Sequence, residues 1–251
     1  MTPRTFLVHG LIAGILAGAA AFLVAHQVGE PQVGAAIALE EAGGHDHPAD
    51  HADEAPLVSR ATQRTWGLGV GSLAVGTALG GVVALAAAAA VGRIGRMTPG
   101  QSTAVVAAVG FVAVGLVPFL KYPADPPGVG SGDTIGARSA DYFGFLLVSV
   151  VAAGLAVALA QRVWRRHGAY AAVVAGTAAY LVPVVVAAHL LPTVDGLDGF
   201  PADTLWYFRR ASLLTQVALW GVLGLVLTGL VDRRWVRHTR DAARRELAAS
   251  L

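Results

Sequence analysis

One short stretch of this sequence holds its densest group of side chains that could bind a metal ion. Within ten residues it gathers three histidines and four acidic residues: His45, Asp46, His47, Asp50, His51, Asp53 and Glu54. Neutral imidazole nitrogens and carboxylate oxygens are donors that suit divalent zinc, nickel, cobalt and copper. Pro48 and the neighbouring glycines favour a loop that can wrap around an ion. The stretch predicts a metal-capturing loop, although its spacing does not select the metal. The alternative is a solvated acidic loop with incidental histidines.

Three further histidines lie within or beside apolar segments. His26 and His189 come at the ends of two such segments, and His9 lies near the start of the chain. Ionisable residues at membrane depth usually face the interior of a helix bundle or a transport pathway. We therefore expect His26 and His189 to receive an ion from the loop, and His9 to pass it on near the opposite face. The alternative is that these are interfacial histidines that hydrogen-bond to the backbone.

Aspartates gather in the connections between the later apolar segments. They are Asp125, Asp133, Asp141, Asp195, Asp198 and Asp203. Clustered carboxylates raise the local concentration of cations, so we expect Asp125 and Asp141 to help form the entrance of an ion pathway. Lys121 would oppose a cation there, and we expect it to pair with Asp125 or a neighbouring carboxylate. Alternatively, these acids only mirror the sorting of basic residues across a membrane.

The elements that must position these side chains are apolar helices. The 251-residue chain has a mean hydropathy of +0.61 and is 55% hydrophobic. Only 14% of its residues are charged, whereas soluble domains have about 25%. The apolar residues come in blocks, and a helix needs roughly 20 of them to cross a bilayer. We predict an all-α, polytopic membrane protein with six transmembrane helices, near residues 5–25, 66–91, 103–120, 142–160, 169–191 and 211–231.

Small residues mark one face of the first two segments. Gly10, Gly14 and Gly18 recur at four-residue spacing in the first, and the second repeats the pattern with Gly67, Gly71, Gly76 and Gly80. Such stripes let neighbouring helices approach closely, so we expect them to serve in packing. We read the first segment as a retained helix, with a cleaved signal peptide as the alternative.

The distribution of charge predicts an orientation. If the N-terminus is cytoplasmic, 12 of the 18 Lys and Arg residues lie inside and 13 of the 16 acidic residues lie outside, as the positive-inside rule requires. Both termini are then cytoplasmic in a multi-pass protein of the inner membrane, with a basic cytoplasmic tail at 232–251. The His/Asp-rich loop at 26–65 and the Pro/Gly-rich loop at 121–141 lie outside. The chain then forms three hairpins that open outward, whose returning helices start after Arg60, Arg138 and Arg210.

Several chemistries lack their sequence signals. The chain has no cysteine, which excludes disulfides and thiolate metal sites. It has no P-loop motif for nucleotides, no nucleophile-elbow serine motif and no zinc-protease motif. We expect neither an enzyme nor a protein that binds nucleotides or nucleic acids.

Two blocks of sequence resemble a known family. They are Leu116-Val-Pro-Phe-Leu-Lys-Tyr-Pro-Ala-Asp-Pro-Pro and Gly199-Phe-Pro-Ala-Asp-Thr-Leu-Trp-Tyr-Phe-Arg-Arg-Ala-Ser-Leu. Both are similar to the marked segments of the CbtA family, predicted membrane subunits of a cobalt transporter, and the resemblance extends over nearly the whole chain. It implies cobalt uptake linked to cobalamin supply, together with a small partner, CbtB, that has one helix and a His-rich segment. This chain departs from the family by carrying its own histidine cluster.

Together these observations predict a membrane subunit of a Co²⁺ uptake system, with Ni²⁺ or Zn²⁺ as other possible ions. The outer loop would capture the ion, and a polar path through the helix bundle would admit it. The alternative is a metal-binding accessory or scaffold subunit that delivers ions to a separate permease.

Overall fold

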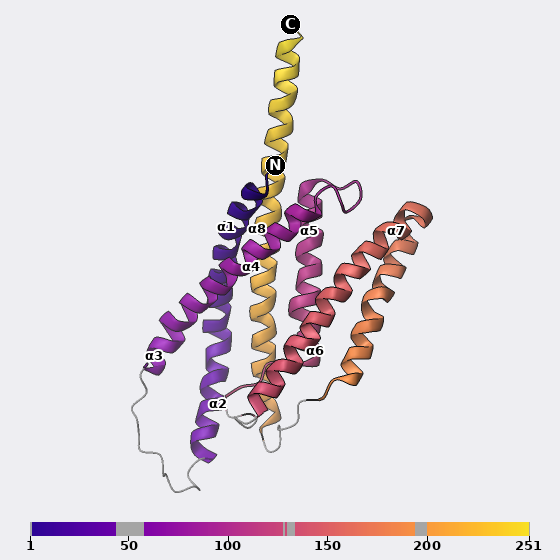
Figure 1. Ribbon diagram of the computed structural model, residues 1–251. Helices are drawn as coiled ribbons and strands as arrows, with labels where there is room; N and C mark the ends of the chain where they lie inside the picture. Colours follow the sequence, from indigo (N-terminus) through magenta and orange to yellow (C-terminus); the bar gives the residue numbers. More distant parts are fainter. Residues whose placement is uncertain (1, 44–57, 128, 130–133, 194–199, 251) are drawn as a thin grey trace. The chain divides into compact units, whose positions relative to one another are not determined.

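The computed structural model describes residues 2–43, 58–127, 129, 134–193 and 200–250, and these residues form helices and no β-strand (Figure 1). In chain order the elements are α1 Pro3–Val24, η1 Ala25–Gly29, α2 Glu30–Gly43, α3 Arg60–Thr62, η3 Gln63–Gly67, α4 Leu68–Ala90, α5 Pro99–Gly110, η4 Phe111–Leu116, α6 Val117–Lys121, α7 Ile135–Leu190 and α8 Ala202–Ala249. The three η elements are π-helical turns. They join neighbouring α-helices without a loop.

Among the described residues, five continuous helices are long and apolar enough to cross a membrane. They span Pro3–Ala42, Arg60–Ala90, Pro99–Lys121, Ile135–Leu190 and Ala202–Ala249. The expected all-α membrane class is confirmed. The count differs from the six predicted segments because two of these segments form parts of one element, α7.

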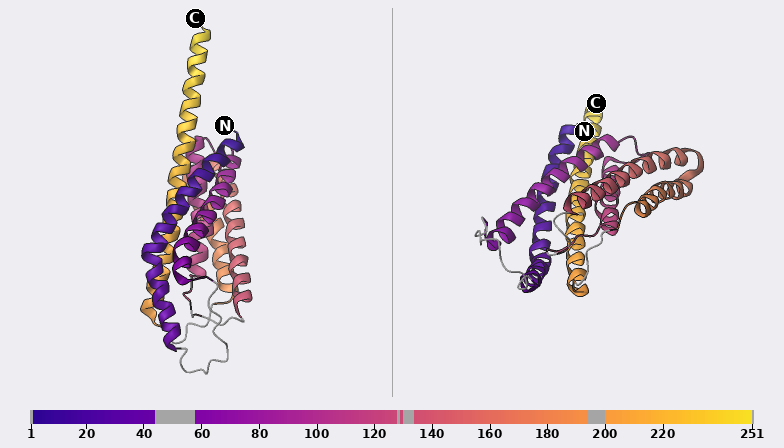
Figure 2. Two further views of the ribbon diagram at one scale, coloured as in Figure 1. Left: turned by 90° about the vertical axis from the view of Figure 1, so that its left-hand side faces the viewer. Right: turned by 60° about the horizontal axis from the view of Figure 1, so that its bottom comes forward.

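The 56-residue α7 consists of two helical arms that meet at Gly168. Gly168 has φ 80° and ψ −177°, a backbone conformation that is essentially restricted to glycine. The chain reverses there without a loop, and both views of Figure 2 show the two arms lying side by side. The arms contain the segments predicted at 142–160 and 169–191.

Several regions expected to be loops are helical. The first helix continues through η1 and α2 to Gly43, so the prediction of a loop from residue 26 is wrong for residues 26–43. Residues 34–42 are mostly alanine, leucine and glutamate, which are strong helix formers. Pro31 lies in the first turn of α2, two residues after the end of η1, and proline is tolerated in the first turn of a helix. Likewise, α3 begins at Arg60, and α7 begins at Ile135 rather than near residue 142.

The chain divides into two compact units, and the first contains residues 1–21, 70–110 and 217–251. In this unit α1 packs against α4 through their glycines. A Cβ atom on Gly14 would collide with the backbone of Gly76, and one on Gly80 would collide with the backbone of Gly10. The expectation that the stripes serve in packing is therefore confirmed for these glycines, but not for Gly71, where a Cβ atom would meet nothing within 4 Å.

The second unit contains residues 22–69 and 111–216. Its core packs Tyr122 against Phe145, Ala152 and Val184, so that both arms of α7 meet the end of α6. Ser149 in the first arm donates a 2.8 Å hydrogen bond to the carbonyl oxygen of Ala113 in η4. The Ser149 hydroxyl also lies 2.9 Å from the Tyr180 hydroxyl in the second arm. These bonds fix the two arms to each other and to the π-helical turn.

Candidate functional site

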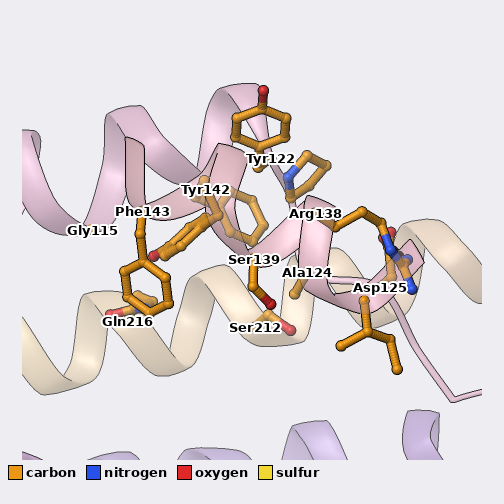
Figure 3. A pocket seen from close by; sticks show the side chains of 13 residues that line it. Gly115, Tyr122, Ala124, Asp125, Arg138, Ser139, Tyr142, Phe143, Ser212 and Gln216 are labelled. Carbon is orange, nitrogen blue, oxygen red and sulfur yellow. Dashed lines mark ion pairs between the residues drawn. The ribbon is translucent and has the colours of Figure 1, made fainter. Parts of the chain in front are cut away.

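A cavity of about 420 Å³ opens in the second unit among α6, the start of α7 and the start of α8 (Figure 3). Its wall mixes aromatic rings with polar groups. It is lined by Gly115, Phe119, Tyr122, Pro123, Ala124, Asp125, Ile135, Arg138, Ser139, Tyr142, Phe143, Ser212 and Gln216. This volume falls within the range of about 300–1,000 Å³ typical of ligand sites, so we treat the cavity as the candidate site.

Asp125 at the edge of this cavity is held by two arginines. Its Oδ1 atom accepts a 2.9 Å hydrogen bond from the Arg209 guanidinium, and its Oδ2 atom lies 3.8 Å from Nη1 of Arg138. Arg209 Nε also donates to the Ala124 carbonyl oxygen at 3.4 Å. We call these three charged side chains the Asp125 cluster.

The local sequence explains why these three side chains meet. Asp125 follows α6 in a segment where Pro123 and Pro126 restrict the backbone and prevent a continuing helix. Arg138 lies in the first turn of α7 and Arg209 in the second turn of α8, so each guanidinium comes from a helix end. The cluster therefore connects the two sequence blocks, 116–127 and 199–213, that carry the family resemblance.

The charge of the cluster is unsuited to binding a cation. Two guanidinium groups face one carboxylate, so the local net charge is positive. All three side chains are largely shielded, with 18% of the Asp125 side chain exposed, and shielding strengthens their attraction. A metal ion would have to displace an arginine to use this carboxylate. Asp125 thus has two arginine partners that its neighbours in the sequence do not predict.

Lys121 does not pair as expected. Its ammonium group donates a 3.2 Å hydrogen bond to the Leu191 carbonyl oxygen and lies 5.2 Å from the centre of the Tyr122 ring. Within the described part of the chain it forms no ion pair with Asp125. The predicted pairing with Asp125 is wrong, because Arg209 and Arg138 already pair with this carboxylate. The neighbouring Asp133 lies outside the described residues.

Tyr122 connects the cavity to the end of α7. Its hydroxyl donates a 2.9 Å hydrogen bond to the Pro192 carbonyl oxygen, and its ring is 8% exposed. Burial raises the pKa of the Tyr122 phenol above its ordinary value, and the negative charge of Asp141 raises it further. Asp141 is partly buried in the second turn of α7.

His26 is engaged with the backbone. It lies in η1, where its Nδ1 atom is 3.1 Å from the Arg64 carbonyl oxygen and its ring stacks on Phe22 at 5.5 Å. One turn further on, Glu30 accepts a 2.6 Å charged hydrogen bond from Arg60. The geometry of His26 agrees with the alternative that the sequence analysis kept open, a histidine bonded to the backbone.

The other two histidines predicted to line the pathway, His189 and His9, lie in different units of the chain. His189 is exposed in the last turn of α7, in the second unit. His9 belongs to the first unit, where it lines a smaller pocket of about 290 Å³ with Arg4 and Arg234. Neither histidine lines the 420 Å³ cavity.

The predicted capture residues, His45, Asp46, His47, Asp50, His51, Asp53 and Glu54, lie outside the described residues. So do Asp133, Asp195 and Asp198, whereas Asp203 accepts a 2.8 Å hydrogen bond from the backbone N–H of Thr204. In the remainder of the chain, no three His, Asp or Glu side chains come together in a way that could hold a metal ion.

The partners of Asp125 and the hydrogen bonds of Ser149 were not predicted from the sequence. The sequence does contain a signal for the partners of Asp125. One family block has an aspartate between prolines, the other has paired arginines, and these residues carry opposite charges. A single serine in an apolar helix gives no comparable signal, and its partner Tyr180 is 31 residues away.

Comparison with known proteins assigns the chain to a family. The model of the CbtA family, described as a probable cobalt transporter subunit, matches residues 3–232. That match includes all five apolar helices up to residue 232 of α8. No curated protein and no solved structure matches the chain. The match covers far more than half of the sequence, and the chain therefore belongs to the CbtA family of probable cobalt transporter subunits.

Proposed function

We propose that this chain is the membrane subunit of an uptake system for a divalent transition metal, with Co²⁺ as the principal ion. The observation that carries the proposal is the family match over residues 3–232, which includes the apolar helices. Ni²⁺ and Zn²⁺ are further candidate ions because they accept the same nitrogen and oxygen donors. The proposal includes a link to cobalamin supply and a small His-rich partner of the CbtB type.

In this proposal the chain crosses the inner membrane six times. Each arm of α7 exceeds the roughly 20 residues that a crossing needs, so α7 supplies two crossings that reverse at Gly168. Arg162, Arg165 and Arg166 lie just before this reversal. By the positive-inside rule, this reversal and both termini belong on the cytoplasmic side. The segment between α2 and α3 then lies on the outer side.

Capture of the ion belongs to the histidines and carboxylates of residues 45–54. An ion released from them would pass the outer ends of the helices, where His26, His189 and Asp141 are candidate contacts. Asp125 stabilises the entrance through its two arginines instead of binding the ion. A divalent cation gains about 4.6 kcal/mol on crossing a membrane potential of about 100 mV, so uptake does not require ATP.

The capture step is tested by radiolabelled cobalt uptake in cells that lack other cobalt importers. Replacing His45, His47 and His51 with Ala should lower uptake at limiting cobalt, with recovery at high concentration, because capture affects affinity before maximal rate. The matched control replaces His167 and His238, which are exposed histidines elsewhere in the chain. Uptake that is unaffected by the triple replacement would refute the capture role.

A second function, delivery of ions to a separate permease, is favoured by the charge of the Asp125 cluster. Arg138 at the cavity edge and Arg209 behind Asp125 repel cations, as expected if the cavity is not an ion path. Purified chain in liposomes separates the two functions. Cobalt flux without any partner supports the permease, whereas cobalt binding without flux supports the accessory.

A further inference from the structure

A second pocket, in the first unit, is rich in hydrogen-bond donors. Its volume is about 290 Å³, and it is lined by Arg4, Thr5, Val8 and His9 of α1 and by Arg234 of α8. The volume is close to the lower end, about 300 Å³, of the range for ligand sites. No carboxylate lines it, so its charge is positive.

Both arginines of this pocket are available to a ligand. Arg4 and Arg234 are exposed, and within the described residues neither takes part in an ion pair. Guanidinium groups bind phosphate and carboxylate through paired hydrogen bonds. The Thr5 hydroxyl, 3.0 Å from the hydroxyl of Thr2, adds a further possible donor.

His9 gives an independent indication of a ligand. Its Nδ1 atom is buried and has no hydrogen-bond partner among the described residues. Burying a nitrogen without a hydrogen-bond partner is costly, and such a group in a native structure calls for a partner. With its proton on Nδ1, the imidazole would donate to an oxygen atom in the pocket. Every polar group that lines the pocket can then donate to an oxygen-rich anion.

We propose that this pocket binds a phosphate group, as carried by the head group of an anionic phospholipid. Arg4 and Arg234 would neutralise the phosphate, His9 would hydrogen-bond to one of its oxygens, and Val8 would contact the apolar part of the lipid. Basic pockets between transmembrane helices are known to receive anionic head groups. The arginines stand near the ends of apolar segments, where head groups lie. This site is independent of metal capture and is tested without metal.

The test uses the full-length chain in nanodiscs of phosphatidylcholine, with phosphatidylglycerol or cardiolipin titrated in. Anionic lipid should raise the thermal unfolding temperature of the wild type. The double variant Arg4→Gln and Arg234→Gln should bind it at least about tenfold more weakly, which corresponds to one charge-assisted hydrogen bond. The matched control, Arg240→Gln and Arg244→Gln, removes the same charge from the exposed tail and should retain tight binding.

Two further arms make the result specific. His9→Phe should weaken lipid binding, whereas His9→Asn, which keeps an N–H group close to the position of Nδ1, should restore much of it. Inorganic phosphate added to neutral nanodiscs tests a free anion as the source: stabilisation by phosphate alone, lost in the Arg4 and Arg234 variant, would keep the site and replace the lipid. Equal losses in the pocket and tail variants, or no loss in either, would overturn the proposal. Circular dichroism of each variant checks that it is folded.

Discussion

Asp125 was expected at the entrance of an ion pathway, and in the structure it forms ion pairs with two arginines. Its position in a Pro/Gly-rich connection and its sign both favoured a role in attracting cations. The structure pairs it with Arg209 at 2.9 Å and Arg138 at 3.8 Å. Breaking a shielded ion pair leaves an uncompensated charge, so the carboxylate stabilises the place where α6, α7 and α8 begin or end. Its sequence neighbours alone could not reveal this, because Arg209 lies 84 residues away.

The first prediction concerns this ion pair. Asp125→Asn should lower the free energy of unfolding in detergent by about 1–2 kcal/mol, since it leaves two guanidiniums without their charged acceptor. Asp203→Asn removes the same charge from an exposed helix start and serves as the control. The effects of Asp125→Asn and Arg209→Gln should be strongly non-additive in a double-mutant cycle. Additive effects would mean that the pair contributes nothing.

The second prediction concerns Tyr122 and pH. Because burial and then Asp141 raise its pKa in the folded state, folding favours the protonated phenol. Its contribution to stability is complete below the unfolded value of about 10 and is lost as the pH rises through the raised pKa. Tyr122→Phe should cost about 1 kcal/mol at neutral pH through its lost hydrogen bond.

The stability difference between the wild type and Tyr122→Phe should then narrow above pH 10 or so, as measured by unfolding in detergent at a series of pH values. Tyr170→Phe is the control, since the Tyr170 ring is 84% exposed and its change should leave stability at neutral pH intact. If the stability difference between the wild type and Tyr122→Phe stays constant or widens at high pH, the protonated Tyr122 phenol does not stabilise the fold as described.

Among the helices, contacts made by small residues were predictable and the continuity of the chain was not. The four-residue spacing of Gly10 and Gly14 appears directly in the sequence, and these residues do contact α4. The π-helical turns η1 and η3 left no comparable signal, so the first helix was expected to end near residue 25. Gly168 was likewise unremarkable in the sequence, because only its φ of 80° distinguishes it from helical glycines.

The third prediction concerns the contact between α1 and α4. Gly14→Ala should destabilise the protein by about 1–3 kcal/mol through overpacking, since its Cβ atom would overlap the Gly76 carbonyl group. In Gly71→Ala the new methyl group meets nothing within 4 Å. That control should be neutral or stabilising, because alanine is the better helix former. The measurement is the thermal unfolding temperature of both variants. Equal unfolding temperatures for Gly14→Ala and Gly71→Ala would show that α1 and α4 do not pack this closely.

For the molecule as a whole, composition was enough to predict an α-helical membrane protein, and the family followed from two short blocks. The lengths and hydropathy of the apolar blocks predict the fold class, because only helices and closed β-barrels can span a bilayer. The geometry of the candidate site was harder to predict from the sequence, because its side chains pair with partners far apart in the chain. The metal-capturing loop and the six crossings stay predictions, and they determine together which side of the membrane receives the ion.

The most direct test of this account asks where residues 45–54 lie. The chain has no cysteine, so Ala52→Cys and Ser250→Cys each introduce a single thiol, the first between His51 and Asp53 and the second at the C-terminus. A membrane-impermeant maleimide should label Ala52→Cys in intact cells and label Ser250→Cys only after the membrane is opened. If Ala52→Cys reacts only after opening, or if the two thiols react alike in intact cells, the histidine cluster and the termini do not face opposite sides and the proposed uptake route is wrong.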